Sequence, residues 1–411
     1  MKKFFALLLS LAMVLALVAC GQKETTTPDD TQTPDDTTPV VEYKIAMITD
    51  YGDITDQSFN QTTYEACKAF AEDNSIEFSY FKPAGDNTAD RVAMIEKAVD
   101  EGYNVIVMPG YAFGGAIVEA APEFPDVKFI ALDVAAGDLL ETAVAKAGEA
   151  YDYTPENWDL NKYVDMSNVY CAVYQEELCG YMAGYAAVKL GYKNLGFLGG
   201  MSVPAVVRYG YGFVQGVDAA AADLGLTDVK LNYIYGGQFF GDADITAVMD
   251  TWYQGGTEVV FACGGGIYTS AVDAAKKANA KVIGVDVDQA GVIAKYAGVD
   301  GMTVTSAMKG LYPATYDTLT DVIVNGNWDK YVGKIATLGL VSGTDPEANY
   351  VQIPMGDGTQ WSDSFTQDDY KAMVKDMFDG KITVSNNTSS DVSAADFATV
   401  ITVDDQGSIK G

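Results

Sequence analysis

Residues 50–61 read Asp50-Tyr-Gly-Asp-Ile-Thr-Asp-Gln-Ser-Phe-Asn-Gln61 and lie between an apolar run at 43–49 and a helical pattern at 59–73. The run is typical of a buried strand, and the pattern is that of an amphipathic helix. In an open α/β sheet, ligands bind beyond the carboxyl ends of the strands, where loops lead into helices. This loop carries three carboxylates, two aromatic rings and an Asn, which suit a polar, flat solute. It has no Gly-x-Gly-x-x-Gly, so it does not indicate a dinucleotide.

Strand and helix patterns alternate along the rest of the chain, which predicts an α/β fold with parallel sheets and helices on both faces. We expect strands near 76–81, 105–108, 128–132, 169–173, 194–198, 230–235, 259–262, 282–285 and 302–306. Helices are expected near 88–101, 112–121, 176–190, 205–224, 244–253, 270–279, 309–324 and 366–378. The roughly 370 residues after the N-terminal region exceed the usual size of one hydrophobic core. We therefore expect two doubly wound lobes, with a boundary near 191–194 and a loop insertion at 152–165.

The N-terminal region has the layout of a secretion signal. Two lysines precede an apolar run at 4–18, which is too short and one-sided for an ordinary membrane span. The run ends in Leu17-Val18-Ala19-Cys20-Gly21, which resembles a bacterial lipobox and implies cleavage before Cys20 and lipid on that residue. Several acyl chains would hold the protein to a membrane, whereas an incidental Cys20 would leave a secreted protein. Residues 21–40, rich in Thr, Pro and Asp, predict a disordered tether.

The composition excludes several classes of function. The formal net charge of −31 and the presence of only two arginines disfavour nucleic acids as partners. The sequence contains no histidine, which removes the commonest general base and histidine metal sites. The cysteines after Cys20 lack metal or redox spacing, and we expect buried free thiols, with a Cys171–Cys179 bridge as the open alternative. We expect no metal and no cofactor.

Five segments point to one family. They are Asp56-Gln-Ser-Phe-Asn-Gln61, Gly212-Phe-Val-Gln-Gly-Val217, Val260-Phe-Ala-Cys-Gly-Gly-Gly266, Val282-Ile-Gly-Val-Asp-Val-Asp-Gln289 and Thr305-Ser-Ala-Met-Lys309. In this order, and after a lipobox, they resemble the basic membrane protein (BMP) family of nucleoside-binding lipoproteins, the substrate-binding components of ABC transporters. The resemblance covers about 43–339. It implies a type I periplasmic-binding-protein fold, with lobe one at 41–191 plus 308–330 and lobe two at 192–307 plus 331–411.

The resemblance also implies a set of ligand contacts. Phe59 matches the ring that stacks on the base, and Asn60 matches the group on the base edge. Asp50 and Asp133 match acidic contacts, and Asp286 and Lys309 match the pair that holds the ribose hydroxyls. We expect Phe240 to be the second stacking ring, with Phe239 as its rival, and Gly265 to let the backbone approach the sugar. The set is Asp50, Phe59, Asn60, Asp133, Phe240, Gly265, Asp286 and Lys309.

Simpler interpretations exist for several of these residues. Phe59 could be a core residue, Ser58 only a helix N-cap and Lys309 a solvated helix residue. Asp56 could merely complement the helix dipole, and Asp53 and Asp56 do not form an EF-hand loop.

We expect an extracytoplasmic solute-binding lipoprotein that is not an enzyme. The resemblance implies a nucleoside ligand, with a purine favoured, an ABC permease as partner, a lipid anchor at Cys20 on the outer side of the cytoplasmic membrane, and a monomer. The alternatives are a binding protein for a sugar or another small polar signal read by a sensor, and a nucleoside hydrolase.

Overall fold

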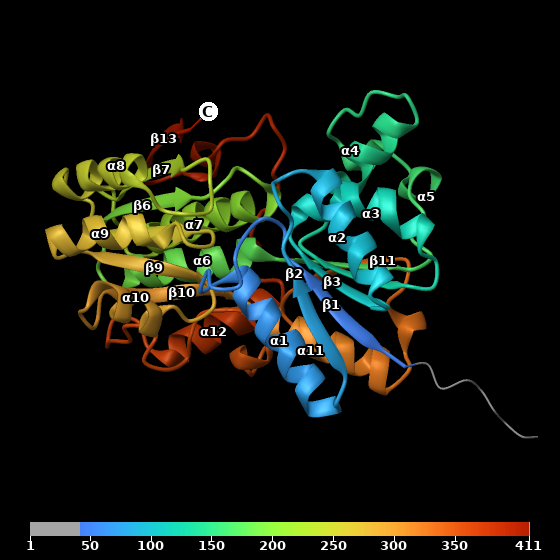
Figure 1. Cartoon of the computed structure of the whole chain (residues 1–411). Coiled ribbons are helices and arrows are strands. Elements are labelled where there is room, and N and C mark those ends of the chain that lie inside the picture. The colour runs from blue at the N-terminus through green and yellow to red at the C-terminus, as the bar shows by residue number, and fades with distance from the viewer. Residues whose placement is uncertain (1–41, 411) are drawn as a thin grey trace, which may run out of the picture. The chain divides into compact units, whose positions relative to one another are not determined.

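The computed structural model describes residues 42–410, and residues 43–411 cluster into one compact unit. The expected signal segment, Cys20 and the tether at 21–40 lie outside the described residues. Two sheets of mainly parallel strands, each flanked by helices, make up this unit and confirm the expected α/β class (Figure 1). Among residues 42–410 we find no helix with the length and apolar character that crossing a bilayer requires.

The first sheet has six parallel strands in the order β11-β5-β4-β3-β1-β2. Their bounds are β1 (Lys44–Ile48), β2 (Glu77–Phe81), β3 (Val105–Pro109), β4 (Lys128–Leu132), β5 (Val169–Tyr174) and β11 (Lys334–Leu338). Strand β3 is buried along its whole length, as its apolar sequence predicts for a strand covered on both faces. The chain turns from β1 outward to β2 and then back to β3, so the strand order reverses between β1 and β3.

The second sheet has seven strands in the order β12-β10-β9-β8-β6-β7-β13, of which only β12 is antiparallel. Their bounds are β6 (Asn194–Gly199), β7 (Lys230–Tyr235), β8 (Val259–Cys263), β9 (Lys281–Asp286), β10 (Thr303–Lys309), β12 (Val351–Gln352) and β13 (Thr402–Ser408). Its strand order reverses between β6 and β8. Each sheet therefore has a point of the kind where α/β proteins bind ligands.

The helices pack on the faces of these sheets (Figure 1). They are α1 (Phe59–Asn74), α2 (Thr88–Asp100), α3 (Gly114–Ala120), α4 (Ala136–Lys146), α5 (Leu160–Tyr163), α6 (Glu176–Lys189), α7 (Pro204–Asp223), α8 (Ala243–Gln254), α9 (Tyr268–Ala278), α10 (Ala290–Ala297), α11 (Leu311–Leu319) and α12 (Gln367–Phe378). Helices α6 and α7 pack closely because glycines face backbone: a Cβ at Gly180 would lie 2.2 Å from the Tyr209 carbonyl oxygen. The sequence patterns did not indicate α4, α5 or α10.

The strand pairing shows where the chain passes between the sheets. It leaves the first sheet after β5, returns to it after β10, and leaves it again after β11. Helix α6 packs against α7 and β10 of the second sheet, and β11 pairs with β5 of the first. We therefore propose lobe boundaries near residues 175, 310 and 339, in place of the expected boundaries near 191, 308 and 330.

Two local expectations are corrected. Lys309 is the last residue of β10 and is buried, so it is not a solvated helix residue, because the helix begins two residues later. The described cysteines Cys67, Cys171, Cys179 and Cys263 are all free and buried, so the Cys171–Cys179 bridge is not formed.

Candidate functional site

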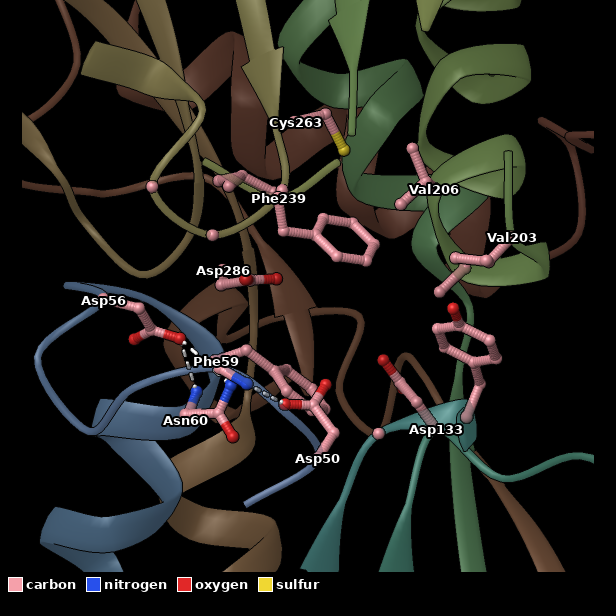
Figure 2. A pocket seen from close by; sticks show the side chains of 18 of the residues that line it. Asp50, Asp56, Phe59, Asn60, Asp133, Val203, Val206, Phe239, Cys263 and Asp286 are labelled. Carbon is pink, nitrogen blue, oxygen red and sulfur yellow. Dashed lines mark hydrogen bonds between the residues drawn. The ribbon is translucent and has the colours of Figure 1, made fainter. Parts of the chain in front are cut away.

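A cavity of about 410 Å³ lies between the two sheets, within the size range of small-molecule sites. Its walls follow the carboxyl ends of strands from both sheets, including β1 and β3 at one reversal of strand order and β8 at the other. The structure brings together here all the residues that the sequence singled out, namely Asp50, Phe59, Asn60, Asp133, Phe240, Gly265, Asp286 and Lys309. Figure 2 shows this cavity from close by.

A buried ion cluster centres on Lys309, whose side chain is 3% exposed. Its ammonium forms ion pairs with Asp133, with Glu176 Oε1 at 3.4 Å and with Asp286 Oδ1 at 3.9 Å. Arg208 Nε donates to Glu176 Oε2 at 2.7 Å, which makes the cluster three carboxylates and two cations. Burial lowers the pKa of Lys309, but the facing carboxylates outweigh this effect and raise it above its usual value. Lys309 is therefore charged at physiological pH.

Asp133 and Asp286 both have positive backbone φ angles, which are unusual for residues other than glycine. Asp133 follows β4 with φ of 59°, and Asp286 ends β9 with φ of 64°. Non-glycine residues in this left-handed region cost on the order of 1–3 kcal/mol each and cluster at functional sites. Burial raises the pKa of Asp133 to about 6, although the Lys309 ammonium opposes this shift. In these conformations, both carboxylates form ion pairs with Lys309.

The loop after β1 is held by its own carboxylates. Asp50 Oδ1 accepts hydrogen bonds from the backbone N–H groups of Tyr51 at 2.6 Å and Gly52 at 2.7 Å. Asp56 accepts from the backbone N–H of Asn60 at 2.9 Å and from its side-chain amide at 3.2 Å. Asp56 thus caps the first turn of α1, and Ser58 does not cap it. Burial raises the pKa of Asp50, and it raises that of Asp56 to about 6 against the opposing hydrogen bonds.

Two aromatic rings enter the cavity from opposite sides. Figure 2 shows Phe59 on the side of the first sheet and Phe239 on the side of the second. The Phe59 ring also lies 4.7 Å from Lys309 Nζ, within the range of a cation–π contact. Phe240 borders the cavity but is 58% exposed, whereas Phe239 is only partly exposed. The geometry therefore favours Phe239, the rival, as the second ring.

Two buried oxygen atoms at the cavity have no hydrogen-bond partner, namely Asn60 Oδ1 and Asp133 Oδ1. A buried acceptor that is left unpaired costs about 1–3 kcal/mol. Both atoms belong to residues that line the cavity, one on each side of Asp50 in Figure 2. Because both atoms are buried, a bound solute with two donor groups would relieve both costs only after the two side chains turn toward it.

The two sheets are bridged across the cavity. Ser58 Oγ, next to α1, donates to Asp286 Oδ2 of β9 at 2.5 Å. The Gln289 side-chain amide donates to the Gln57 carbonyl oxygen at 3.1 Å. Residues at and just after the end of β9 thus bind directly to the loop that precedes α1.

The sequence reasoning missed several residues of the site. Glu176 and Arg208 complete the ion cluster, and Tyr209 donates to Asp286 Oδ1 at 3.2 Å. Glu176 is fully buried at the first position of α6, where an acidic residue is ordinarily expected for the helix dipole. One signal was available: Arg208 is one of only two arginines in the chain.

The sequence of this chain is similar to those of known proteins. The family model described as ABC transporter substrate-binding protein PnrA-like (Bmp) matches residues 43–345. The "ABC transporter nucleoside-binding protein BmpA" of Lactococcus lactis is 26% identical over 357 residues, covering 84% of this chain and 89% of that protein. An uncharacterized lipoprotein of Pyrococcus abyssi is 26% identical over 317 residues, covering 74% of this chain and 68% of that protein.

A solved structure supports the fold. The crystal structure of ABC transporter solute-binding proteins from Aeropyrum pernix K1 superposes with a TM-score of 0.59 at 20% identity, covering 84% of this chain and 88% of that chain. The likeness extends over both sheets and shows the type I solute-binding-protein fold.

Proposed function

The chain belongs to the Bmp family of PnrA-like ABC transporter substrate-binding proteins, and on this premise we propose that its ligand is a nucleoside, with a purine favoured. The observation that carries the proposal is that two aromatic side chains, Phe59 and Phe239, line one cavity together with Asn60 and Asp133, each of which has a buried acceptor without a hydrogen-bond partner. The relative from Lactococcus lactis, named for nucleoside binding, supports the same ligand class.

The proposed binding mode places the base between the rings. Stacking of a base on an aromatic ring is worth about 1–3 kcal/mol and tolerates different bases. Asn60 Oδ1 would accept a hydrogen bond from an N–H group on the base edge, and Asp133 Oδ1 from a sugar hydroxyl. A ligand that lacks the matching donor would leave one acceptor unpaired and bind more weakly.

The charge of the site favours a nucleoside over a nucleotide. The ion cluster holds three carboxylates, Asp133, Glu176 and Asp286, against two cations, so it is negative by one charge when all are ionised. Both cations are already paired. Lys82 also lines the cavity and pairs with Asp53 at 3.0 Å, so a phosphate group would meet carboxylates and cations that already have partners.

We propose a binding role without turnover. Lys309 engages both Asp133 and Asp286, and Ser58 and Tyr209 also donate to Asp286. Carboxylates that are held in this way are poorly placed to take a proton from water, as a nucleoside hydrolase would require. The expected outcome is a ligand that is released unchanged.

As the substrate-binding component of an ABC transporter, the protein would deliver its ligand to a membrane permease. The bridges Ser58–Asp286 and Gln57–Gln289 join the two proposed lobes across the cavity, and we propose that this arrangement is the closed form. We propose that ligand binding shifts a hinge equilibrium toward this closed form, which the permease recognises. The protein would act as a monomer, anchored by lipid at Cys20 on the outer face of the cytoplasmic membrane.

A thermal-shift screen tests the ligand class. The panel contains purine and pyrimidine nucleosides, the free bases, the 5′-monophosphates and simple sugars. A ligand present at one hundred times its dissociation constant stabilises the folded protein by about 2.7 kcal/mol. We expect a shift with nucleosides only. A shift with a sugar and none with any nucleoside would favour the sugar-binding alternative.

A further inference from the structure

The segment Thr402–Lys410 extends the second sheet beyond the residues matched by the family model, which end at 345. Strand β13 pairs in parallel with β7, from Thr402 opposite Lys230 to Ser408 opposite Tyr235. The backbone N–H of Ile409 then donates to the Tyr235 carbonyl oxygen at 2.8 Å. Figure 1 shows β13 beside β7, close to α8. This segment therefore runs to the carboxyl end of β7, where the cavity loop begins.

The loop at 236–242, between β7 and α8, carries Phe239 and Phe240 into the cavity wall. Three backbone hydrogen bonds hold this loop to neighbouring segments. Gly236 N–H donates to the Gly199 carbonyl oxygen at 2.7 Å, Gly237 N–H to the Gly200 carbonyl oxygen at 2.9 Å, and Gly266 N–H to the Phe239 carbonyl oxygen at 2.8 Å. The loop has no regular secondary structure apart from a single bridge between Phe240 and Gly266. At the end of the loop, the Asp242 backbone N–H also donates to Ser270 Oγ at 3.0 Å.

Lys410 also contacts this loop. Its ammonium forms an ion pair with Asp242, the N-cap of α8, and donates to Gln238 Oε1 at 2.9 Å. The Gln238 amide in turn donates to the Phe240 carbonyl oxygen and to Asp242 Oδ2, both at 2.9 Å. The Lys410 backbone also packs against the loop, since a Cβ at Gly237 would lie 2.6 Å from the Lys410 carbonyl oxygen. One side chain thus joins Gln238 to Asp242 at the end of the loop.

We propose that Lys410 is a positioning residue for the ligand site, which holds the loop at 236–242 so that Phe239 lines the cavity before ligand arrives. The inference rests on the proposed nucleoside function, because it assigns Phe239 to the ligand. When a loop is ordered before the ligand binds, the free-energy cost of ordering it does not weaken binding. When the ordered form is populated less, the apparent affinity falls by the same fraction.

The expected effect is modest because the contact is partly exposed. The side chain of Lys410 is 34% exposed and that of Asp242 is 27% exposed. Ion pairs of this kind contribute up to about 1 kcal/mol, which corresponds to roughly a fivefold change in an equilibrium constant. We therefore expect Lys410→Ala to weaken nucleoside binding about two- to fivefold. Lys410→Arg keeps the charge and should bind nearly as the natural protein does.

The test combines amide hydrogen exchange with calorimetry on the full chain. Exchange in residues 236–242 is measured without ligand for the natural protein, Lys410→Ala, Lys410→Arg and the control Lys381→Ala. Lys381 also forms surface ion pairs, to Asp376 at 2.7 Å and Asp379 at 3.4 Å, but on residues that do not line the cavity. Nucleoside affinity is then measured for the same four proteins.

The proposal predicts faster exchange confined to 236–242 and weaker binding in Lys410→Ala, with recovery in Lys410→Arg and no change in Lys381→Ala. Unchanged exchange in this loop would overturn it, as would faster exchange with unchanged affinity. Faster exchange throughout the second lobe would show a general structural role and also overturn it. If the natural protein binds no nucleoside, the nucleoside function fails separately, and exchange in the loop alone decides whether Lys410 positions it.

Discussion

Removal of the Phe59 ring tests the stacking arrangement most simply. Phe59 is the first residue of α1, lines the cavity and is only partly buried, so Phe59→Ala should leave the fold intact. Loss of one stacking face costs about 1–3 kcal/mol, which weakens nucleoside binding roughly 5- to 150-fold. The ring also lies 4.7 Å from Lys309 Nζ, and loss of this cation–π contact adds to the effect.

The assay is isothermal titration calorimetry, with folding checked by circular dichroism. Phe59→Tyr keeps the ring and should bind almost as tightly as the natural protein. Phe78→Ala is the matched control, because Phe78 is also a partly buried phenylalanine but lies on β2 outside the cavity. A Phe59→Ala affinity within twofold of the natural value, or an equal loss in Phe78→Ala, would refute the stacking argument.

Three further predictions concern charge and anchoring. Burial raises the pKa of Asp138 to about 7, so the folded state binds this proton more tightly than the unfolded state does. The resulting stabilisation is lost as pH rises from about 4 to 7. Asp138→Asn should flatten that part of the stability–pH profile measured by urea unfolding, and an unchanged profile would contradict the raised pKa of Asp138. Lys309→Met leaves three buried carboxylates without their central cation and should lower the free energy of unfolding by about 3–5 kcal/mol and abolish nucleoside binding; an unchanged urea midpoint would contradict the cluster's role. Cys20→Ser should move the protein from the membrane to the soluble fraction, and continued membrane association would argue against the anchor.

The sequence predicted the class of fold because its signals are local. Apolar runs such as Val105-Ile-Val-Met108 have the length and composition of strands covered on both faces, and the structure places them there. The ordered motifs pointed to the family, and the residues carried over from it all line one cavity. Asp133 and Asp286 were expected from the family resemblance, and both lie at strand ends and line the cavity.

The sequence could not predict contacts between distant segments. Glu176 meets Lys309 across 133 positions of sequence, and nothing local marks either residue as part of a cluster. Phe239 and Phe240 are neighbours in an irregular loop, which has no periodic pattern to indicate which of the two rings points into the cavity. Strand β13 contains Asp404 and Asp405 and lacks an apolar face, so its pairing at the sheet edge was not expected. These features depend on tertiary packing.

The central claim is that a nucleoside binds in the cavity between Phe59 and Phe239 and leaves unchanged. A calorimetric titration of the natural protein with a purine nucleoside, followed by chromatography of the recovered ligand, tests it most directly. We predict one site per chain, with intact nucleoside recovered and no binding of the corresponding 5′-monophosphate. Release of free base, equal binding of the monophosphate, or no heat with any nucleoside would contradict the account.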